Sequence, residues 1–209
     1  MKQPDPRHDI LELSQLERLF DAPREQSVLK EIDHVDVNYA AWIAAAPFFV
    51  LATAGPGGLD CSPRGDAPGF VQLLDPKTLL IPDRRGNNRI DSFRNLIADP
   101  RVALLFMIPG LGETLRVNGR ARINGDPEVL THCAVNGMAP KLVLVVSVEA
   151  AYFQCSRALV RSRLWDPATQ VAPGALPTVG KILAHITSDR IDGVAYDRAL
   201  PDRVKTTLY

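Results

Sequence analysis

Residues 114–123 read Thr-Leu-Arg-Val-Asn-Gly-Arg-Ala-Arg-Ile, and polar and apolar residues alternate along this stretch. The apolar positions are Leu115, Val117, Ala121 and Ile123, and the polar ones are Thr114, Arg116, Asn118, Arg120 and Arg122. Because successive side chains of a strand point to opposite faces, this period of two predicts an antiparallel strand with one face in the core. The arginine-bearing face is either solvated or, at Arg116, part of a binding surface.

Five further short runs are also rich in strand-forming residues. They are residues 48–53, 69–73, 78–81, 102–108 and 142–153, with Gly- and Pro-containing turns at 54–58 and 109–112. Two helices are expected among them, at residues 90–98, where apolar residues follow helical spacing, and at residues 127–135. Six short strands within about 110 residues predict a barrel or a sandwich, so the expected class is mainly β with some helix.

Helices are also expected on both sides of this β region. Residues Ser14 to Glu17 have the pattern of a capping box, and Asp36 is a candidate cap for a helix that Pro47 ends. A Pro-containing linker at residues 173–177 precedes a helix near 179–186 and a polar tail to residue 209.

The composition excludes several classes of protein. The 209 residues carry 24 Lys and Arg against 24 Asp and Glu, which counts against a duplex-binding or polybasic membrane-surface protein. The three cysteines show no zinc or disulfide spacing, and the sequence has neither a signal peptide nor an apolar run long enough to span a membrane. We therefore expect a cytoplasmic protein with reduced thiols. Of the 24 cations 18 are Arg, the side chain suited to bidentate capture of phosphate.

Three of these arginines, Arg84, Arg85 and Arg89, lie in a Gly- and Asn-containing loop between an expected strand and an expected helix. A helix N-terminus presents unpaired N–H groups and a positive dipole end, so this arrangement predicts a phosphate cradle. The structural alternative is that Asn88 caps the helix and Asp91 completes a box-like arrangement. The loop is neither a Walker A motif nor a Rossmann fingerprint.

Two further clusters contain candidate binding residues. Arg64, in the run Cys61 to Pro68, lies either in a turn between two strands or on an inner β position beside the phosphate loop. Its Arg-Gly-Asp sequence does not indicate an adhesion protein, because the chain has no secretion signal or disulfide pattern. In the second cluster Arg157, Arg161 and Trp165 are spaced by four, so a helical turn would place them on one side.

Known catalytic constellations are absent from the sequence. The four histidines lack the spacing of metal ligands, so no metal site is predicted, and no nucleophile elbow is present. Arginines that could bind phosphate, without an evident acid, base or nucleophile, are typical of a protein whose cofactor carries the chemistry.

Four segments together resemble the pyridoxamine 5′-phosphate oxidase-related family of flavin-nucleotide-binding proteins. They are residues 62–66, 82–89, 114–119 and 155–165, and the similarity covers about residues 46–167. The resemblance implies a six-stranded split β-barrel with flanking helices, which forms a homodimer with FMN at the subunit interface. The chain would comprise an N-terminal helical arm (residues 1–46), an FMN-binding barrel (47–167), and a C-terminal helix and tail packed on that barrel (168–209).

The resemblance also implies which residues contact FMN. Arg64 and the loop at 84–89 match the phosphate-binding positions, and the backbone around Pro82 would face the ribityl chain and the isoalloxazine. Thr114 and Arg116 match a strand that helps to line the cleft, in the same subunit or in the other one. The residues from 157 to 165 would lie near the ring or the mouth of the cleft. The complete set is Arg64, Gly65, Asp66, Ile81, Pro82, Asp83, Arg84, Arg85, Asn87, Asn88, Arg89, Thr114, Arg116, Arg157, Arg161 and Trp165.

The chain departs from the authentic oxidase in two places. Asn87 and Asn88 stand where the oxidase has an Arg-Lys pair, and the Arg-rich ending that contacts pyridoxal phosphate is missing. These departures count against vitamin B6 oxidation and leave an FMN-dependent oxidoreductase of unknown substrate as the prediction. The main alternative is a non-catalytic protein that stores, carries or senses the flavin. Deazaflavin or haem binding and single-stranded nucleic-acid binding are further alternatives, although no histidine stands out as an axial ligand and only 6% of residues are aromatic.

Overall fold

The computed structural model describes residues 2–209, which fall into two units divided between Glu31 and Ile32. The first unit contains a short 3₁₀ helix (η1, Pro6–His8) and the helices α1 (Leu13–Glu17) and α2 (Glu25–Leu29), none of which has a buried residue. The capping box predicted from Ser14 is wrong by two residues, because Glu12 is the N-cap of α1 and forms the box with Gln15.

The second unit begins with helix α3 (Val37–Ala45), which has the cap that the sequence predicts. Asp36 accepts a hydrogen bond of 2.8 Å from the backbone N–H of Tyr39, and Ile43 is fully buried. The helix stops at Ala46, because the residue before Pro47 is restricted to extended conformations.

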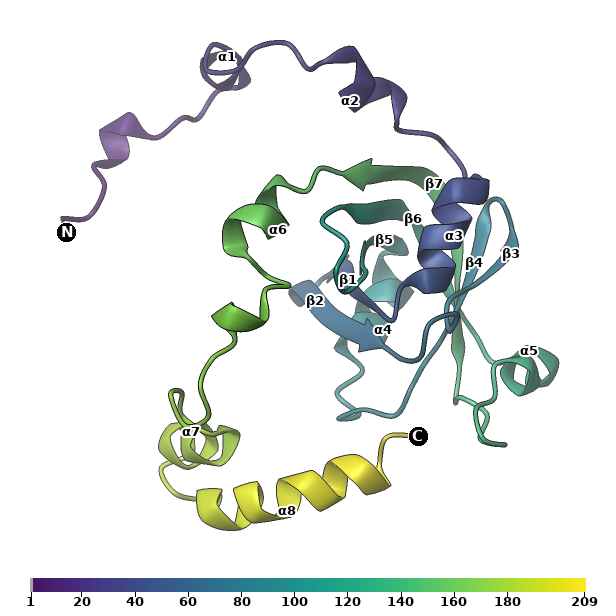
Figure 1. Cartoon of the computed structure of the whole chain (residues 1–209), viewed down its shortest axis with the longest axis vertical. Coiled ribbons are helices and arrows are strands. Elements are labelled where there is room, and N and C mark those ends of the chain that lie inside the picture. Colours follow the sequence, from purple (N-terminus) through teal and green to yellow (C-terminus); the bar gives the residue numbers. More distant parts are fainter. Residues whose placement is uncertain (1) are drawn as a thin grey trace. The chain divides into compact units, whose positions relative to one another are not determined.

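A single antiparallel sheet dominates this unit (Figure 1). Its strands are β1 (Phe48–Gly55), β2 (Gly58–Gly65), β3 (Gln72–Asp75), β4 (Thr78–Pro82), β5 (Arg101–Met107), β6 (Thr114–Asn124) and β7 (Val143–Gln154). They lie in the order β2-β1-β5-β6-β7-β4-β3, so the sheet is open and β2 and β3 are its edges. With its flanking helices this is the α+β split barrel that the sequence predicts, built from seven strands instead of six.

The additional strand is β2, in the segment where the sequence leaves open a turn between two strands or an inner β position for Arg64. A tight turn joins it to β1 with Gly55 opposite Gly58, which confirms the predicted hairpin. Polar residues and a proline give β2 little strand propensity, so its pairing with β1 decides its structure. The strand expected at residues 69–73 is displaced and begins at Gln72.

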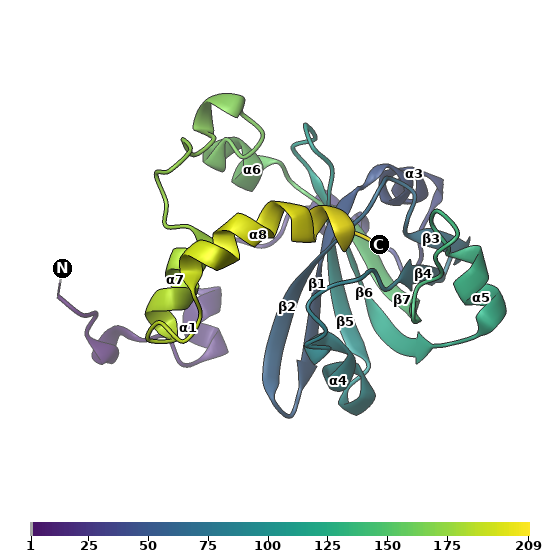
Figure 2. The same ribbon diagram turned by 90° about the horizontal axis from the view of Figure 1, so that it is seen from below.

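The core lies on the concave side of the sheet. Phe49, Leu51, Leu104 and Phe106 are at most 1% exposed, and the ring of Phe49 lies 5.1 Å from that of Phe106. Helix α4 (Asp91–Ala98) adds Phe93 and Leu96 to this core and packs against β1, β2 and β6 near one end of the strands (Figure 2). Helix α5 (Pro127–His132) covers a smaller cluster that includes Leu80 and Val145.

The chain after β7 is helical. Helix α6 (Arg157–Ser162) and a 3₁₀ turn (η2, Pro167–Thr169) lead to α7 (Val179–Ile186), as predicted, and to α8 (Gly193–Thr206). Helix α8 occupies the segment expected to be a polar tail, and it accommodates Pro201 in its interior. Among residues 2–209 none of the helices combines the length and the apolarity needed to cross a bilayer.

Candidate functional site

A polar cavity of about 400 Å³ lies where edge strand β2 meets the chain between β4 and α4. It is lined by Asp60, Ser62, Pro63, Arg64, Asp83, Arg84, Gly86, Asn87, Asn88, Arg89, Ile90, Asp91, Ser92 and Phe93. The structure thus brings Arg64 beside the loop that the sequence predicts to be a phosphate cradle. The two are far apart in the chain: Ser92, just after the loop, follows Arg64 by 28 residues and accepts a hydrogen bond from it.

Arg64 is held on the cavity wall by a short network of side chains. Its guanidinium Nη2 donates to Ser92 Oγ at 3.3 Å, and Ser92 Oγ donates to Asp60 Oδ2 at 2.5 Å. Ser62 also donates to Asp60, and the hydrogen bond from Ser92 is the main reason why the pKa of Asp60 lies below its ordinary value. Asp60 therefore stays ionised and orients Ser92, which leaves Arg64 fixed from one side and open to the cavity on the other.

The loop before α4 adopts backbone conformations that are rare for its residues. Asn88 and Ile90 have φ values of 59° and 54°, and Asn87 Oδ1 accepts from the N–H of Arg89 at 3.0 Å. A left-handed conformation is costly for a β-branched residue such as Ile90, and strain of this kind concentrates at binding sites. The structural alternative in which Asn88 caps α4 is wrong, because Ile90 is the N-cap position and supplies no side-chain hydrogen bond.

The missing cap leaves the N-terminus of α4 open toward the cavity. Asp91, Ser92 and Phe93 form its first turn and line the cavity. The backbone N–H groups of a first turn have no partner within the helix, and the dipole makes this end positive. An anion in the cavity would therefore meet both Arg64 and the start of α4.

The three loop arginines have different environments. Arg84 is 16% exposed, pairs through Nε with Asp66 at 2.5 Å and donates through Nη1 to the carbonyl oxygen of Cys133 at 3.0 Å. Arg89 is 74% exposed and pairs with Asp91 at 2.6 Å, and Arg85 is exposed. The Arg84 side chain is thus held by hydrogen bonds within the protein, whereas the exposed Arg89 side chain can reorient toward a ligand in the cavity.

Of the three predicted residues at the end of β4 and just after it, Asp83 lines the cavity, whereas Ile81 and Pro82 are buried and do not line it. Ile81 is 2% exposed with its side chain in the core, and the N–H of Asp83 donates to the carbonyl oxygen of Leu142 at 3.0 Å. Burial raises the pKa of the Asp83 carboxyl, and the positive charges of Arg64, Lys141 and Arg84 oppose this shift only in part.

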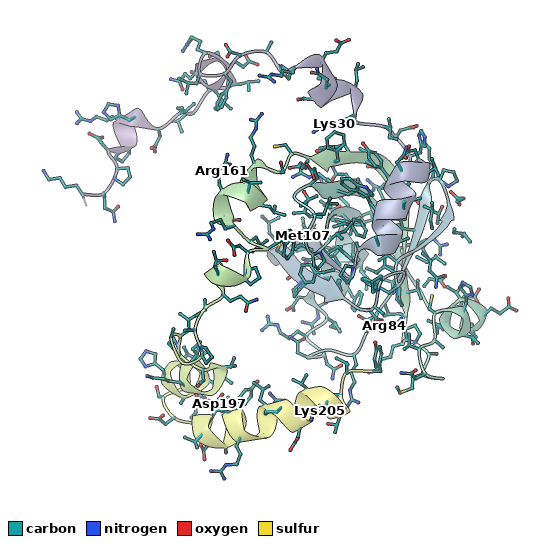
Figure 3. All side chains as sticks on the ribbon, viewed as in Figure 1. Lys30, Arg84, Met107, Arg161, Asp197 and Lys205 are labelled. Carbon is teal, nitrogen blue, oxygen red and sulfur yellow. The ribbon has the colours of Figure 1, made fainter. Side chains whose placement is uncertain are left out.

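A second group of predicted residues, called here the second cluster, lies outside this cavity on β6 and on the chain after β7: Thr114, Arg116, Arg157, Arg161 and Trp165. Thr114 is buried, and Arg116 Nη1 donates to the hydroxyl of Tyr152 at 3.0 Å. Arg157 and Arg161 belong to α6, and Figure 3 shows Arg161 well apart from Arg84. The prediction of a single helical face for Arg157, Arg161 and Trp165 is wrong, because α6 ends at Ser162. Trp165 instead donates from its indole N–H to the carbonyl oxygen of Leu111 at 2.8 Å.

Arg64 and Arg116 lie on opposite faces of the sheet. Arg64 is opposite Phe49, Phe49 is opposite Phe106, and Phe106 is opposite Leu115, so these four residues share the concave face. Arg116 follows Leu115 in β6 and therefore projects from the convex face. One chain does not bring Arg64 and Arg116 to the same cavity.

The sequence missed the two side chains that position Arg64. Asp60 and Ser92 hold Arg64 in place, but nothing in their local pattern distinguishes them from ordinary polar residues. The available signal is the expected proximity of Arg64 to the loop, which would have directed attention to Asp60, on the same face of the strand as Arg64, and to Ser92, in the helix after the loop. Among residues 2–209 there is no group of three or more His, Cys, Asp or Glu side chains that could hold a metal ion.

The fold is thus an open antiparallel split barrel with a polar cavity, lined in part by Arg64 and Arg89, beside its edge strand β2. Residues 35–155, more than half of the chain, match the pyridoxamine 5′-phosphate oxidase family model, and the chain belongs to this family. The resemblance recognised in the sequence is thereby confirmed. No curated protein matches the chain.

Solved structures with a similar fold are distant in sequence. HupZ from Group A Streptococcus is 16% identical with a TM-score of 0.48, over 58% of this chain and 95% of that one. General stress protein 26 from Bacillus anthracis is 18% identical with a TM-score of 0.40, over 54% and 88% of the two chains. An FMN-binding protein from Syntrophomonas wolfei is 12% identical with a TM-score of 0.44, over 55% and 82%.

Proposed function

We propose that this protein binds FMN in the cavity between β2, residues 83–90 and α4, and uses the flavin in an oxidation–reduction reaction. The observation that carries the proposal is the convergence of Arg64 with the uncapped N-terminus of α4 on one cavity. Both features favour a phosphate group, and membership of the pyridoxamine 5′-phosphate oxidase family supports a flavin as its carrier.

The residues of the chain have separate roles in this proposal. Arg64 binds the phosphate with the first-turn N–H groups of α4, Ser92 and Asp60 hold its guanidinium in place, and Arg89 adds a second cation from the loop. When bound, FMN supplies hydride and single-electron transfer, which no side chain of the cavity can perform. The chain's own contribution is therefore binding and orientation.

A homodimer belongs to the same proposal, because the second cluster would complete the site from a partner copy. The convex face carries apolar residues on β1, β5 and β7, and β6 lies between the last two strands. These residues are Phe48, Val50 and Ala52 on β1, Ala103, Leu105 and Met107 on β5, and Ala150 on β7. Between Ala103 and Ala150 lies Asn118, whose Oδ1 is the only buried side-chain oxygen or nitrogen without a hydrogen-bond partner among residues 2–209. A facing copy would cover the apolar surface and could supply the missing donor.

We expect light scattering on the purified protein to give twice the chain mass of 22.9 kDa. Replacing Leu105 with a charged residue should shift the mass toward the monomer, because an unpaired charge would be buried at the interface. Replacing the exposed Leu59 on β2 in the same way is the matched control. A monomeric mass for the wild-type protein with FMN still bound would contradict a shared site.

The absorption spectrum of the purified protein tests flavin binding. FMN is added, free nucleotide is removed by desalting, and we expect flavin bands to remain with the protein. Bleaching of these bands by NADH or NADPH, followed by recovery with an added electron acceptor, would support an oxidoreductase. Retained flavin without reduction by either donor would favour the non-catalytic carrier or sensor. A protein that retains no FMN would contradict both.

A further inference from the structure

Asp66, which follows β2 directly, is a buried carboxylate that joins three distant parts of the sequence. Its side chain is 3% exposed. Oδ1 accepts from the N–H of Ala67 and from the hydroxyl of Tyr209, both at 2.7 Å, and Oδ2 accepts from Arg84 Nε at 2.5 Å. Burial on its own would raise the pKa of Asp66, but the hydrogen bonds from Tyr209, Ala67 and Arg84 together hold it below its ordinary value.

Tyr209 reaches Asp66 from the far end of a helical hairpin. Helices α7 and α8 pack closely because Gly180 and Gly193 lack side chains, and a Cβ on Gly180 would lie 2.1 Å from the carbonyl oxygen of Gly193. Asp197 of α8 fixes the pair by accepting from Thr178 Oγ1 at 2.5 Å and from the N–H of Gly180 at 2.8 Å. Tyr209 is therefore presented by a fixed hairpin, and Figure 3 shows the chain after α8 returning to the side of the sheet that carries Arg84.

Arg84 connects this contact to the proposed FMN site. It lines the cavity of the phosphate loop and also a smaller cavity of about 210 Å³ that includes Asp66, Cys133 and Tyr209. With Asp66 on one side and the carbonyl oxygen of Cys133 on the other, Arg84 anchors the start of the loop that continues through Asn88 and Ile90. The strained loop thus depends on an anchor that Tyr209 helps to orient.

We propose that Tyr209 is a latch for the phosphate loop, and that Tyr209 and Asp66 are positioning residues that hold the loop closed through Arg84. The effect of this latch on nucleotide affinity rests on the proposed FMN site. The hydroxyl of Tyr209 fixes the rotation of the Asp66 carboxylate, and that rotation fixes the guanidinium of Arg84. The hydrogen bond to Asp66 is the main reason why the pKa of Tyr209 lies above its ordinary value, so the hydroxyl keeps its proton and remains a donor at neutral pH. Because coupling is reciprocal, a ligand that orders the loop also strengthens the latch.

The test compares Tyr209→Phe with Tyr196→Phe, a control in α8 where Arg203 stacks on the ring at 4.3 Å. Both changes remove one hydroxyl and keep the ring. The first measurement is limited digestion of the ligand-free protein with trypsin, since Arg84, Arg85 and Arg89 make the loop a substrate when it opens. We expect Tyr209→Phe to speed loop cleavage about fivefold, the factor set by one ordinary hydrogen bond, and to leave cleavage after Arg18 unchanged. The second measurement is FMN titration, where about fivefold weaker binding is expected for Tyr209→Phe alone.

Each outcome decides the proposal. Equal loop cleavage in the two variants would overturn the latch, and faster cleavage with unchanged FMN affinity would overturn its role in nucleotide binding. If the wild-type protein binds no FMN, the proposed function fails, while the digestion still decides whether Tyr209 holds the loop. Protection of the loop by FMN in the wild type, reduced in Tyr209→Phe, would support the coupling.

Discussion

Replacing Arg64 with alanine is expected to weaken FMN binding by about 1.5 to 3 kcal/mol, or about 10- to 150-fold. The variant loses a charged hydrogen-bond donor that Ser92 and Asp60 hold against the cavity wall. In the wild-type protein the Arg64 guanidinium is already held in place, so FMN binding costs it little conformational entropy. The Arg64→Ala variant therefore saves little entropy that could offset the lost hydrogen bond. Titration of flavin fluorescence with wild type and variant measures the effect.

Two matched variants make this result specific. Arg89→Ala should fall toward the lower end of the same range, because Arg89 is 74% exposed and already paired with Asp91. Arg120→Ala, which removes an exposed arginine from β6, should leave affinity unchanged. Unaltered binding in both Arg64→Ala and Arg89→Ala would rule out this cavity as the phosphate site.

The sequence predicts the parts of the fold in which local pattern and tertiary structure agree. The alternating stretch becomes β6 with Leu115, Val117 and Ala121 buried and Ile123 half-buried, and Asp36 caps α3 as expected. Strand β2 could not be recognised in this way, because Asp60, Ser62 and Pro63 have weak strand propensity and only pairing with β1 makes them a strand. The same pairing with β1 places the Arg64 side chain on the face of the sheet that carries Phe49.

Details of the site that depend on backbone strain or on long-range contacts could not be predicted from the sequence. Asn88 is a reasonable helix cap by residue type, but a left-handed Ile90 takes that position in the structure. The sequence gives Arg84, Arg85 and Arg89 equal weight, whereas the structure pairs Arg84 with the buried Asp66 and leaves Arg89 exposed. Tyr209 has no local signal, because its partner is 143 residues away.

Replacing Asp66 with asparagine is expected to destabilise the protein by about 3 kcal/mol at neutral pH. The variant keeps the shape of the side chain but leaves Arg84, only 16% exposed, without its counter-charge. Removing one partner of a buried ion pair is costly because the remaining charge stays desolvated. Urea unfolding of wild type and variant gives the difference, with Asp99→Asn as control: its partner Arg101 is 71% exposed, so that change should cost less than about 1 kcal/mol.

The pH dependence separates a charge effect from a packing effect at Asp66. The pKa of this carboxyl lies below its ordinary value of 3.8 in the folded protein, so the folded state binds fewer protons than the unfolded state. The stabilisation is therefore complete above the ordinary pKa and is lost as the pH falls through the lower pKa of the folded state. The difference between wild type and Asp66→Asn should stay constant from about pH 5 to 8 and shrink below about pH 4. A difference that persists unchanged in acid would mean that asparagine disturbs packing, and that the Asp66–Arg84 charge pair does not stabilise the base of the phosphate loop.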